Sequence, residues 1–383
     1  MNVLILSDTQ PGGEWIATQT VIKNLKMKDK KFKFYLISSN KSNKSLNRSL
    51  FEEVFFIKKK TFKKPLKHYR ELLFQIINGA KIIHFLIKKK KINLVIITDY
   101  LLAISYLIVA RKKDYIFFFH GIKNRYRIFF DTFNHYLIFK KILEIISWTL
   151  AKKIITPSIF AKNFLTNSYQ FLNKKNFVII PNLIRKNFKI IISRSIIKKF
   201  KEKFRLKNRK ILLYSGRLVE GKGVENLIKS FLRIKNQYSN LILVVAYCGE
   251  EKKSLIVNDE KIKYFKNLNI NDLVKLYQLS NLAILPSYFE ISPLFVREAI
   301  FCNLPIISTN CGDVKNILSN LFIIKDNKIN TITEKIKDFL SKESFYKKEF
   351  LKIRNNFIKF SYCEDKIIKS WQKLFKNYEK QKK

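Results

Sequence analysis

The chain has 383 residues, a length that at roughly 100–200 residues per domain predicts two domains. Its 47% hydrophobic content excludes global disorder, and its 9 Gly and 7 Pro exclude collagen-like and low-complexity architectures. The 76 Lys and Arg outnumber the 29 Asp and Glu, which gives a net charge of +47. This charge fits either solvated lysine faces or a polyanionic partner, such as an anionic membrane surface or a nucleic acid.

Two features of the sequence bear on where the protein is located in the cell, and they agree. The chain begins with an apolar segment, Met1–Ser7, that lacks the basic region and the cleavage site of a signal peptide. Its four cysteines show no CxxC spacing, which favours reduced thiols in a cytosol over a disulfide framework or a zinc site. We therefore expect a cytoplasmic protein.

The most apolar window, 92–110, has two interpretations. Its first part is rich in β-branched residues and is followed by Asp99, which favours a strand, a turn and a buried helix. A membrane span is the alternative.

Short β-branched runs alternate with amphipathic segments along the whole chain. A first series of strands is predicted at Val3–Ser7, Phe34–Ser38, Leu94–Thr98, Tyr115–Phe119, Ile154–Thr156 and Val178–Ile180. A second series is predicted at Lys210–Ser215, Leu241–Ala246, Lys263–Phe265, Leu282–Leu285, Ile306–Ser308 and Leu321–Ile323. Between strands, segments such as Val224–Ile234 have apolar residues at helical spacing. The pattern predicts an α/β protein with two doubly wound, Rossmann-like parallel sheets and a seam between Pro181 and Lys210.

Glycine is scarce, and its positions are informative. All but Gly79 fall in predicted strand-to-helix connections, namely Gly12, Gly13, Gly121, Gly216, Gly221, Gly223, Gly249 and Gly312. Ordinary turn glycine would explain each one singly. Their collection at the carboxyl edges of both sheets, where doubly wound folds bind ligands, predicts a ligand cleft between the domains.

The sharpest glycine segment is 216–223, which follows a predicted strand and precedes a helix. Free N–H groups at the helix start, together with Arg217 and Lys222, would suit a diphosphate. The spacing approaches that of a P-loop, but Gly223 stands where the Mg²⁺-binding hydroxyl belongs, so NTP hydrolysis is not expected. A solvated Arg and Lys on a loop is the alternative.

A pair of carboxylates follows in the segment 285–299. Glu290 lies in the loop after a strand, and Glu298 lies inside the next helix among apolar neighbours. Because a buried carboxylate needs partners, Glu298 could bind a sugar or ribose diol. The alternative is an internal ion pair with a lysine or with Arg297.

One histidine differs in position from the other three. His120 stands at the carboxyl end of an all-apolar strand, before Gly121, where an active-site imidazole would lie. A structural role is equally compatible with this position. No His, Asp and Cys cluster has metal-ligand spacing, so no metal site is expected.

In this order, the motifs resemble the retaining, nucleotide-sugar-dependent glycosyltransferases of family 4, which have the GT-B fold. The glutamate pair Glu290 and Glu298, with seven residues between, carries the resemblance together with the Gly-Arg…Lys-Gly element of 216–223. The double glycine of the first loop, the His-Gly at residue 120, Pro157-Ser158 and Pro181-Asn182 fall in family order as well.

The resemblance implies two Rossmann-like domains at 1–187 and 188–358, with a final helix, 359–383, that crosses back onto the first domain. It also implies hexosyl or N-acetylhexosaminyl transfer from a nucleotide-diphosphate sugar with retention of anomeric configuration. No cofactor is expected, since Arg217 and Lys222 would neutralise the leaving diphosphate in place of a metal ion.

The resemblance also assigns roles to single residues. Glu298 would hold the ribose hydroxyls, and Glu290 would hold the donor sugar with the N–H groups of the following loop. His120 would hydrogen-bond the sugar or the departing phosphate, and the backbone of the first loop would approach both. Further substrate-binding residues are expected at Gly12, Gly13, Gly216, Ser292 and Leu294.

Three departures from the family pattern bear on the donor. The usual glycine-aromatic-glycine after the first glutamate is Ile291-Ser292-Pro293, and Pro293 has no N–H to donate. The glycine that often follows Pro-Asn is Leu183, and the usual G-x-G is reduced to Tyr247-Cys248-Gly249. The identity of the sugar is therefore left open.

Basic and aromatic residues cluster in the first domain and bear on the acceptor. The clusters are Lys58–Lys60 with Lys63, Lys64 and Lys67, then Lys88–Lys91, then Asn124–Lys141. Such clusters suit an anionic lipid interface, although lysine beside ordinary core faces would also produce them. The expected acceptor is a saccharide, lipid-linked or of the lipopolysaccharide type, at the inner face of the cytoplasmic membrane.

Two other functions share parts of this pattern. A nucleotide-sugar epimerase would have the same Rossmann-like halves, but the two cations and two acids favour transfer. A nucleic-acid-binding protein would explain the charge, but the sequence shows no recognised nucleic-acid-binding module. No nucleic acid is therefore expected as a partner.

Overall fold

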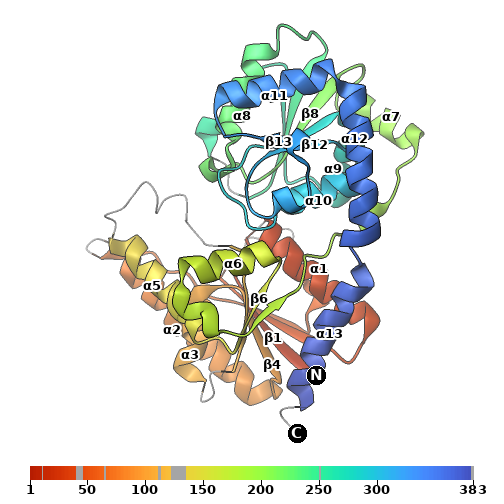
Figure 1. Ribbon diagram of the computed structural model, residues 1–383. Coiled ribbons are helices and arrows are strands. Elements are labelled where there is room, and N and C mark those ends of the chain that lie inside the picture. Colours follow the sequence, from red (N-terminus) through yellow and green to blue (C-terminus); the bar gives the residue numbers. More distant parts are fainter. Residues whose placement is uncertain are drawn as a thin grey trace. The chain divides into compact units, whose positions relative to one another are not determined.

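The computed structural model describes residues 1–10, 12–39, 46–63, 66–110, 114–121, 135–249 and 252–380. The chain forms two compact units (Figure 1). Unit 1 comprises Met1–Leu183 and Glu364–Lys383, and unit 2 comprises Ile184–Cys363. The expected domain ends were residues 187 and 358.

Unit 1 is built on a seven-stranded parallel sheet with the strand order β3-β2-β1-β4-β5-β6-β7. The strands are β1 (Asn2–Ser7), β2 (Lys33–Ser38), β3 (Glu53–Phe56), β4 (Leu94–Ile97), β5 (Ile116–Phe118), β6 (Lys153–Thr156) and β7 (Phe177–Ile179). The central strands are buried on both faces, which explains why they appear in the sequence as continuous apolar runs.

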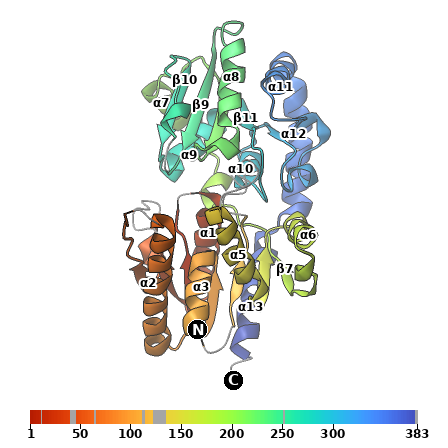
Figure 2. The same cartoon turned by 90° about the vertical axis from the view of Figure 1, so that its left-hand side faces the viewer.

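Helices cover both faces of this sheet. They are α1 (Gly13–Lys28), α2 (Lys67–Lys90), α3 (Tyr100–Val109), α5 (His135–Thr149), α6 (Ile159–Ser168) and α13 (Glu364–Lys380). Figures 1 and 2 show α2, α3 and α5 side by side on one face, with α1 and α13 on the other. A cluster of Leu72, Ile76, Tyr100 and Leu143 joins α2, α3 and α5.

The last helix is part of the core of unit 1. The rings of Trp371 and Phe118 pack edge to face with centroids 5.1 Å apart, and those of Phe375 and Phe32 do so at 5.3 Å. Trp371 and Phe375 are each 1% exposed. Helix α13 therefore closes a hydrophobic core that the N-terminal part of the chain begins.

Unit 2 has a six-stranded parallel sheet with the order β10-β9-β8-β11-β12-β13. Its strands are β8 (Lys210–Gly216), β9 (Leu241–Tyr247), β10 (Ile262–Lys266), β11 (Leu282–Leu285), β12 (Ile306–Thr309) and β13 (Ile323–Ile324). Its helices are α7 (Arg194–Lys203), α8 (Val224–Ile234), α9 (Ile270–Leu279), α10 (Leu294–Phe301), α11 (Ile329–Ser341) and α12 (Glu343–Asn356). The predicted class, two Rossmann-like parallel-sheet domains, is confirmed.

One strand was missed, and one strand prediction was wrong in detail. Strand β3 was not predicted, because it lies at the sheet edge, is only half-buried and begins with a glutamate. The strand expected at Leu321–Ile323 is a 3₁₀ turn at Asn320–Phe322 followed by the short β13. The helix expected at Val224–Ile234 is confirmed as α8.

The apolar window 92–110 contains β4 and α3 rather than one long helix. Asp99 ends the strand segment and caps α3, since its Oδ1 accepts from the N–H of Leu102 at 3.0 Å. Among the residues described, none of the helices combines the length and the hydropathy that a membrane crossing requires.

We predict that Trp371→Ala lowers the free energy of unfolding by about 3–5 kcal/mol, because it leaves a cavity beneath α13. Ile108→Ala, at a position of α3 that is 62% exposed, is the matched control and should change it by less than about 1 kcal/mol. Urea unfolding of both variants measures the difference. Equal losses would contradict the place of α13 in the core.

Candidate functional site

The strand order of unit 2 reverses between β8 and β11, which are neighbours in the sheet. From β8 the chain proceeds to β9 and β10 on one side, and β11, β12 and β13 follow on the other side. The loops after β8 and β11 therefore leave the carboxyl edge of the sheet at a topological switch point, the usual place for a ligand in doubly wound folds.

These two loops are in direct contact. Gly223 has a φ of +66°, and a Cβ atom there would lie 2.0 Å from the carbonyl oxygen of Pro286. The N–H of Tyr288 donates to the carbonyl of Gly221 at 3.1 Å. Only glycine fits at residue 223, so this residue fixes how closely the two loops approach.

The approach of the loops brings together one predicted cation and one predicted acid. Lys222 Nζ lies 2.5 Å from Glu290 Oε1, which also accepts from Ser287 Oγ at 2.9 Å. The side chains of Lys222 and Glu290 are 20% and 14% exposed. The two groups neutralise each other.

Arg217 differs from Lys222. It is exposed, and in the described part of the chain its guanidinium group forms no ion pair or hydrogen bond. Its backbone carbonyl accepts from Tyr214 Oη at 2.8 Å, which holds the start of the loop. Arg217 therefore presents an uncompensated positive charge on the loop after β8, which also carries Lys222.

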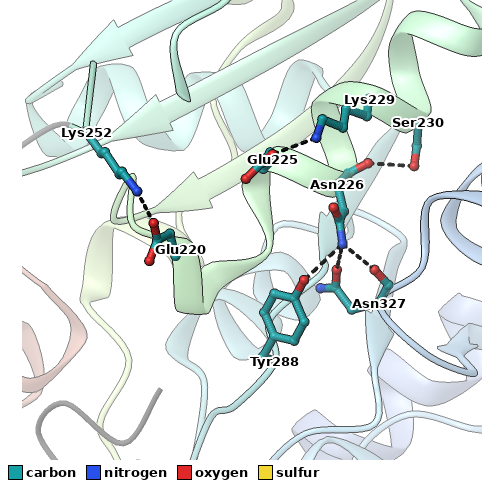
Figure 3. A network of polar contacts seen from close by, with 8 residues as sticks. All are labelled: Glu220, Glu225, Asn226, Lys229, Ser230, Lys252, Tyr288 and Asn327. Atoms are coloured by element: carbon teal, nitrogen blue, oxygen red, sulfur yellow. Dashed lines mark hydrogen bonds and ion pairs between the residues drawn. The ribbon is translucent and has the colours of Figure 1, made fainter. Parts of the chain in front are cut away.

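The start of α8 is held by an amide network (Figure 3). Asn226 Nδ2 donates to Tyr288 Oη at 3.0 Å and to the carbonyl oxygen of Asn327 at 2.6 Å, so the helix start is tied to the β11 loop. The nearby acids have their own cations, since Glu220 pairs with Lys252 and Glu225 with Lys229. These acids therefore leave the charge of Arg217 available to a ligand.

Glu298 lies on α10 and is 7% exposed. Its Oε1 accepts from Arg185 Nη2 at 2.7 Å, and its Oε2 accepts from Tyr277 Oη at 2.9 Å. Glu298 thus forms an internal ion pair, as in the alternative interpretation, but the partner is Arg185 rather than a lysine or Arg297. Arg297 does not face Glu298 because it is the adjacent residue of the same helix. Burial, and then the charge of Glu298, raises the pKa of Tyr277 well above its ordinary value, so this hydroxyl remains a donor.

Arg297 instead forms a buried ion pair with Asp313, in the loop after β12. Arg297 Nη2 lies 2.6 Å from Asp313 Oδ2, and the side chains are 7% and 4% exposed. Ser292 Oγ donates to the same Oδ2 at 2.9 Å, and the N–H of Asp313 donates to the carbonyl of Ile291 at 3.2 Å. The loop 290–293 is thus fastened to the loop after β12.

The N-terminus of α10 follows this loop. The helix begins at Leu294, and its N-cap Pro293 provides no side-chain acceptor for the N–H groups of the first turn. The N-cap of α8, Gly223, provides none either. Uncapped helix N-termini attract anions and polar oxygens, and both of these lie at the carboxyl edge of the same sheet.

His120, Gly12 and Gly13 lie in unit 1. His120 follows β5, and its Nε2 lies 3.2 Å from Thr18 Oγ1 of α1, the helix that begins at Gly13. Thr18 donates its only hydroxyl proton to the carbonyl of Glu14 at 3.1 Å, so Nε2 of His120 must be the donor to Thr18. This contact orients the imidazole of His120 against α1.

Cysteine chemistry does not fit this part of unit 2. Burial, the largest effect, raises the pKa of Cys311 to about 12 and also raises the pKa of Cys248. Both are protonated thiols near neutral pH and are therefore weak nucleophiles. Among the residues that the structure describes, no group of three or more His, Cys, Asp and Glu side chains could hold a metal ion.

Sequence reasoning missed four polar residues of this site: Ser287, which contacts Glu290; Arg185 and Tyr277, which contact Glu298; and Asp313, which contacts Arg297. The signal for Asp313 was its place directly after Gly312, at the carboxyl edge of a strand. Arg185 and Tyr277 lie far from Glu298 along the chain, and no local pattern marks them.

Comparison with known families and curated proteins finds similarity to glycosyltransferases. Residues 196–362, within unit 2, match the family model Glycosyl transferases group 1. An uncharacterized glycosyltransferase of Methanocaldococcus jannaschii is 27% identical over 285 residues, which are 69% of this chain and 68% of that protein. The capsular polysaccharide biosynthesis glycosyltransferase CapM of Staphylococcus aureus is 26% identical over 217 residues, 52% of each chain.

Solved structures share the fold over nearly the whole chain. Sucrose-phosphate synthase of Thermosynechococcus elongatus has a TM-score of 0.77 at 11% identity, over 98% of both chains. HepE of Anabaena, solved in complex with UDP and glucose, has a TM-score of 0.73 at 14% identity, over 98% of this chain and 99% of that one. At such low identity, the likeness concerns the two-domain GT-B fold alone.

We predict that Asp313→Asn lowers the free energy of unfolding by about 3–5 kcal/mol, because it leaves the buried charge of Arg297 without a counter-charge. The double variant Arg297→Met/Asp313→Leu replaces both charges by apolar groups and should recover most of this loss. Urea unfolding measures both. A single variant as stable as the wild type would contradict the ion pair.

Proposed function

We propose that this protein, whose unit 2 is a Glycosyl transferases group 1 domain within a GT-B fold, transfers a hexose or N-acetylhexosamine from a nucleotide-diphosphate sugar to a saccharide acceptor. The observation that carries the proposal is the contact of Lys222 with Glu290 where the sheet order reverses, with Arg217 on the same loop as Lys222 and Glu298 on the helix that follows Glu290. HepE, a neighbour in fold, was solved with UDP and glucose, which supports a nucleotide-sugar donor.

The diphosphate would lie at the start of α8. Arg217 offers an exposed charge without a partner, and the uncapped N–H groups of α8 add the positive end of a helix dipole. Lys222 would exchange its contact with Glu290 for a phosphate oxygen. The backbone at Gly216 and the cations would then stabilise the negative charge that develops on the leaving nucleoside diphosphate, without a cofactor.

The rest of the donor would lie along the β11 loop. Glu298 has two occupied oxygens, but a carboxylate accepts about four hydrogen bonds, so the ribose hydroxyls can still donate to it. Glu290, released from Lys222, would accept from the sugar hydroxyls. The N–H groups of Ser292 and Leu294 would contribute through the backbone, since the Ser292 hydroxyl is already directed at Asp313.

Unit 1 would supply groups that act on the sugar side. We propose that His120 hydrogen-bonds the sugar or the departing phosphate, and that Gly12 and Gly13 let the first loop approach the donor. The contact of His120 with Thr18 supports a fixed imidazole orientation. Transfer would retain the anomeric configuration, as in the family that the motifs resemble.

The acceptor side would face a membrane. Helices α2 and α5, joined by a contact between the rings of Tyr69 and Phe139, expose large apolar side chains. These are Leu73, Ile77, Phe85, Ile138, Phe139 and Ile142. Basic side chains accompany them on the same helices, including Lys88–Lys90 and Lys140, whose ammonium lies 4.3 Å from the ring of Tyr136.

We propose that this apolar and basic surface docks on anionic lipids at the inner face of the cytoplasmic membrane and that the acceptor is lipid-linked or of the lipopolysaccharide type. Of the basic clusters expected from the sequence, Lys58–Lys60, Lys63, Lys67 and Lys88–Lys91 are described. Lys64 and residues 124–134 of the third cluster lie outside the described residues.

We predict that one of UDP-, GDP- and ADP-glucose or their N-acetylhexosamine counterparts raises the melting temperature in a differential-scanning screen, and that Arg217→Ala abolishes the shift. Arg209→Ala is the matched control, because Arg209 is also exposed but precedes the amino end of the same strand, β8. The control should keep the full shift. Retention of the shift by Arg217→Ala would contradict the proposed diphosphate site.

We also predict that the protein co-sediments with vesicles containing anionic lipid at low salt and that Ile138→Gln/Ile142→Gln reduces the bound fraction severalfold. Ile191→Gln, at a position of unit 2 that is 91% exposed, should leave binding unchanged. Indifference of the wild type to anionic vesicles would refute the docking surface.

A further inference from the structure

A guanidinium group that the sequence did not single out lies beside Glu298. Arg185, the second residue of unit 2, donates through Nη2 to Glu298 Oε1 at 2.7 Å. Its guanidinium carbon lies 4.8 Å from the ring centroid of Phe188. The side chain is 22% exposed. An acid on one side and an aromatic ring on another thus hold the planar group.

One donor of this group has no acceptor. The Nε–H of Arg185 is buried and forms no hydrogen bond to any part of the chain that the structure describes. A buried donor without an acceptor is costly, and proteins rarely retain one without a reason. A ligand acceptor could satisfy it only if the guanidinium group shifts on binding and opens Nε–H to the ligand.

The position of Arg185 relative to other charges points to the nature of that ligand. Cys248, which follows β9, has its pKa raised chiefly by burial, and the charges of Arg217, Arg185 and Glu298 all act on this thiol. Two guanidinium groups and a carboxylate from three segments therefore lie within electrostatic range of the end of β9. Arg185 contacts Glu298, the acid proposed to bind the ribose hydroxyls. Arg217 lies on the loop proposed to bind the diphosphate.

We propose that Arg185 is a donor-binding residue that contacts an acceptor atom of the nucleoside part of a nucleoside diphosphate. This inference rests on the proposed function. The Nε–H would donate to the ribose or base, and Nη2 would keep Glu298 oriented toward the ribose hydroxyls. The fixed fork of arginine donors allows one guanidinium group to serve both, which the point charge of lysine cannot do.

A purely internal role would also place Arg185 beside Glu298, so the experiment must separate the two. Arg185→Lys keeps a positive charge for Glu298 but lacks Nε–H and the planar fork. Tyr277→Phe is the matched control, because it removes the hydrogen bond to the other oxygen of the same carboxylate. Arg185→Met, which keeps the aliphatic stem on Phe188, is a second variant, and melting temperatures verify that each variant is folded.

Isothermal titration of the full chain with UDP, GDP and ADP, and with uridine, guanosine and adenosine, tests the inference. For the nucleotide that binds the wild type, Arg185→Lys should weaken the binding of both the nucleoside diphosphate and the nucleoside by about tenfold or more. This is the effect expected for loss of a charge-assisted hydrogen bond. Arg217→Ala should weaken the binding of the nucleoside diphosphate but not that of the nucleoside. Tyr277→Phe should weaken either ligand by less than about threefold.

Two results would overturn the inference. One is an Arg185→Lys variant that binds diphosphate and nucleoside as the wild type does. The other is a loss no larger than that of Tyr277→Phe, which would make Arg185 an internal counter-charge alone. In both cases the wild type binds a nucleotide, so the proposed function stands; a wild type that binds none of the three diphosphates would overturn the proposed function as well.

Discussion

The site in unit 2 depends on how closely two loops approach each other at the carboxyl edge of its sheet. A side chain at Gly223 would collide with the carbonyl of Pro286, so only glycine permits the observed contact. That contact brings Lys222 onto Glu290 and places the start of α8 beside the loop that leads to α10. The reversal of strand order between β8 and β11 is what makes these loops neighbours.

Ion pairs between side chains determine the net charge of this region. Arg185 pairs with Glu298 and Lys222 pairs with Glu290, which leaves Arg217 as the positive charge in excess among these described residues. A diphosphate would meet Arg217 directly and would compete with Glu290 for Lys222. The ion pair of Arg297 and Asp313 is buried and internally compensated, so it holds the loop 290–293 without adding to this charge.

Much of the fold could be predicted because strands buried on both faces leave continuous apolar runs. Strand β3 escaped prediction because an edge strand needs no such run. The predicted site residues of unit 2 follow β8 and β11 or lie on the adjoining helix, so their proximity followed from topology. The partners of Glu298 did not, since Arg185 and Tyr277 are separated from it by 113 and 21 residues. Such contacts arise only from tertiary packing, and Arg297, the neighbour in sequence, points elsewhere.

Hydrogen–deuterium exchange of the full chain with and without the stabilising nucleotide sugar tests most directly whether the donor binds at this edge of unit 2. Our account predicts slower exchange in segments 216–224 and 287–298, with no comparable change around the amino ends of β8 and β11. Protection confined to segments outside unit 2, or unchanged exchange in both loops at saturating ligand, would contradict it.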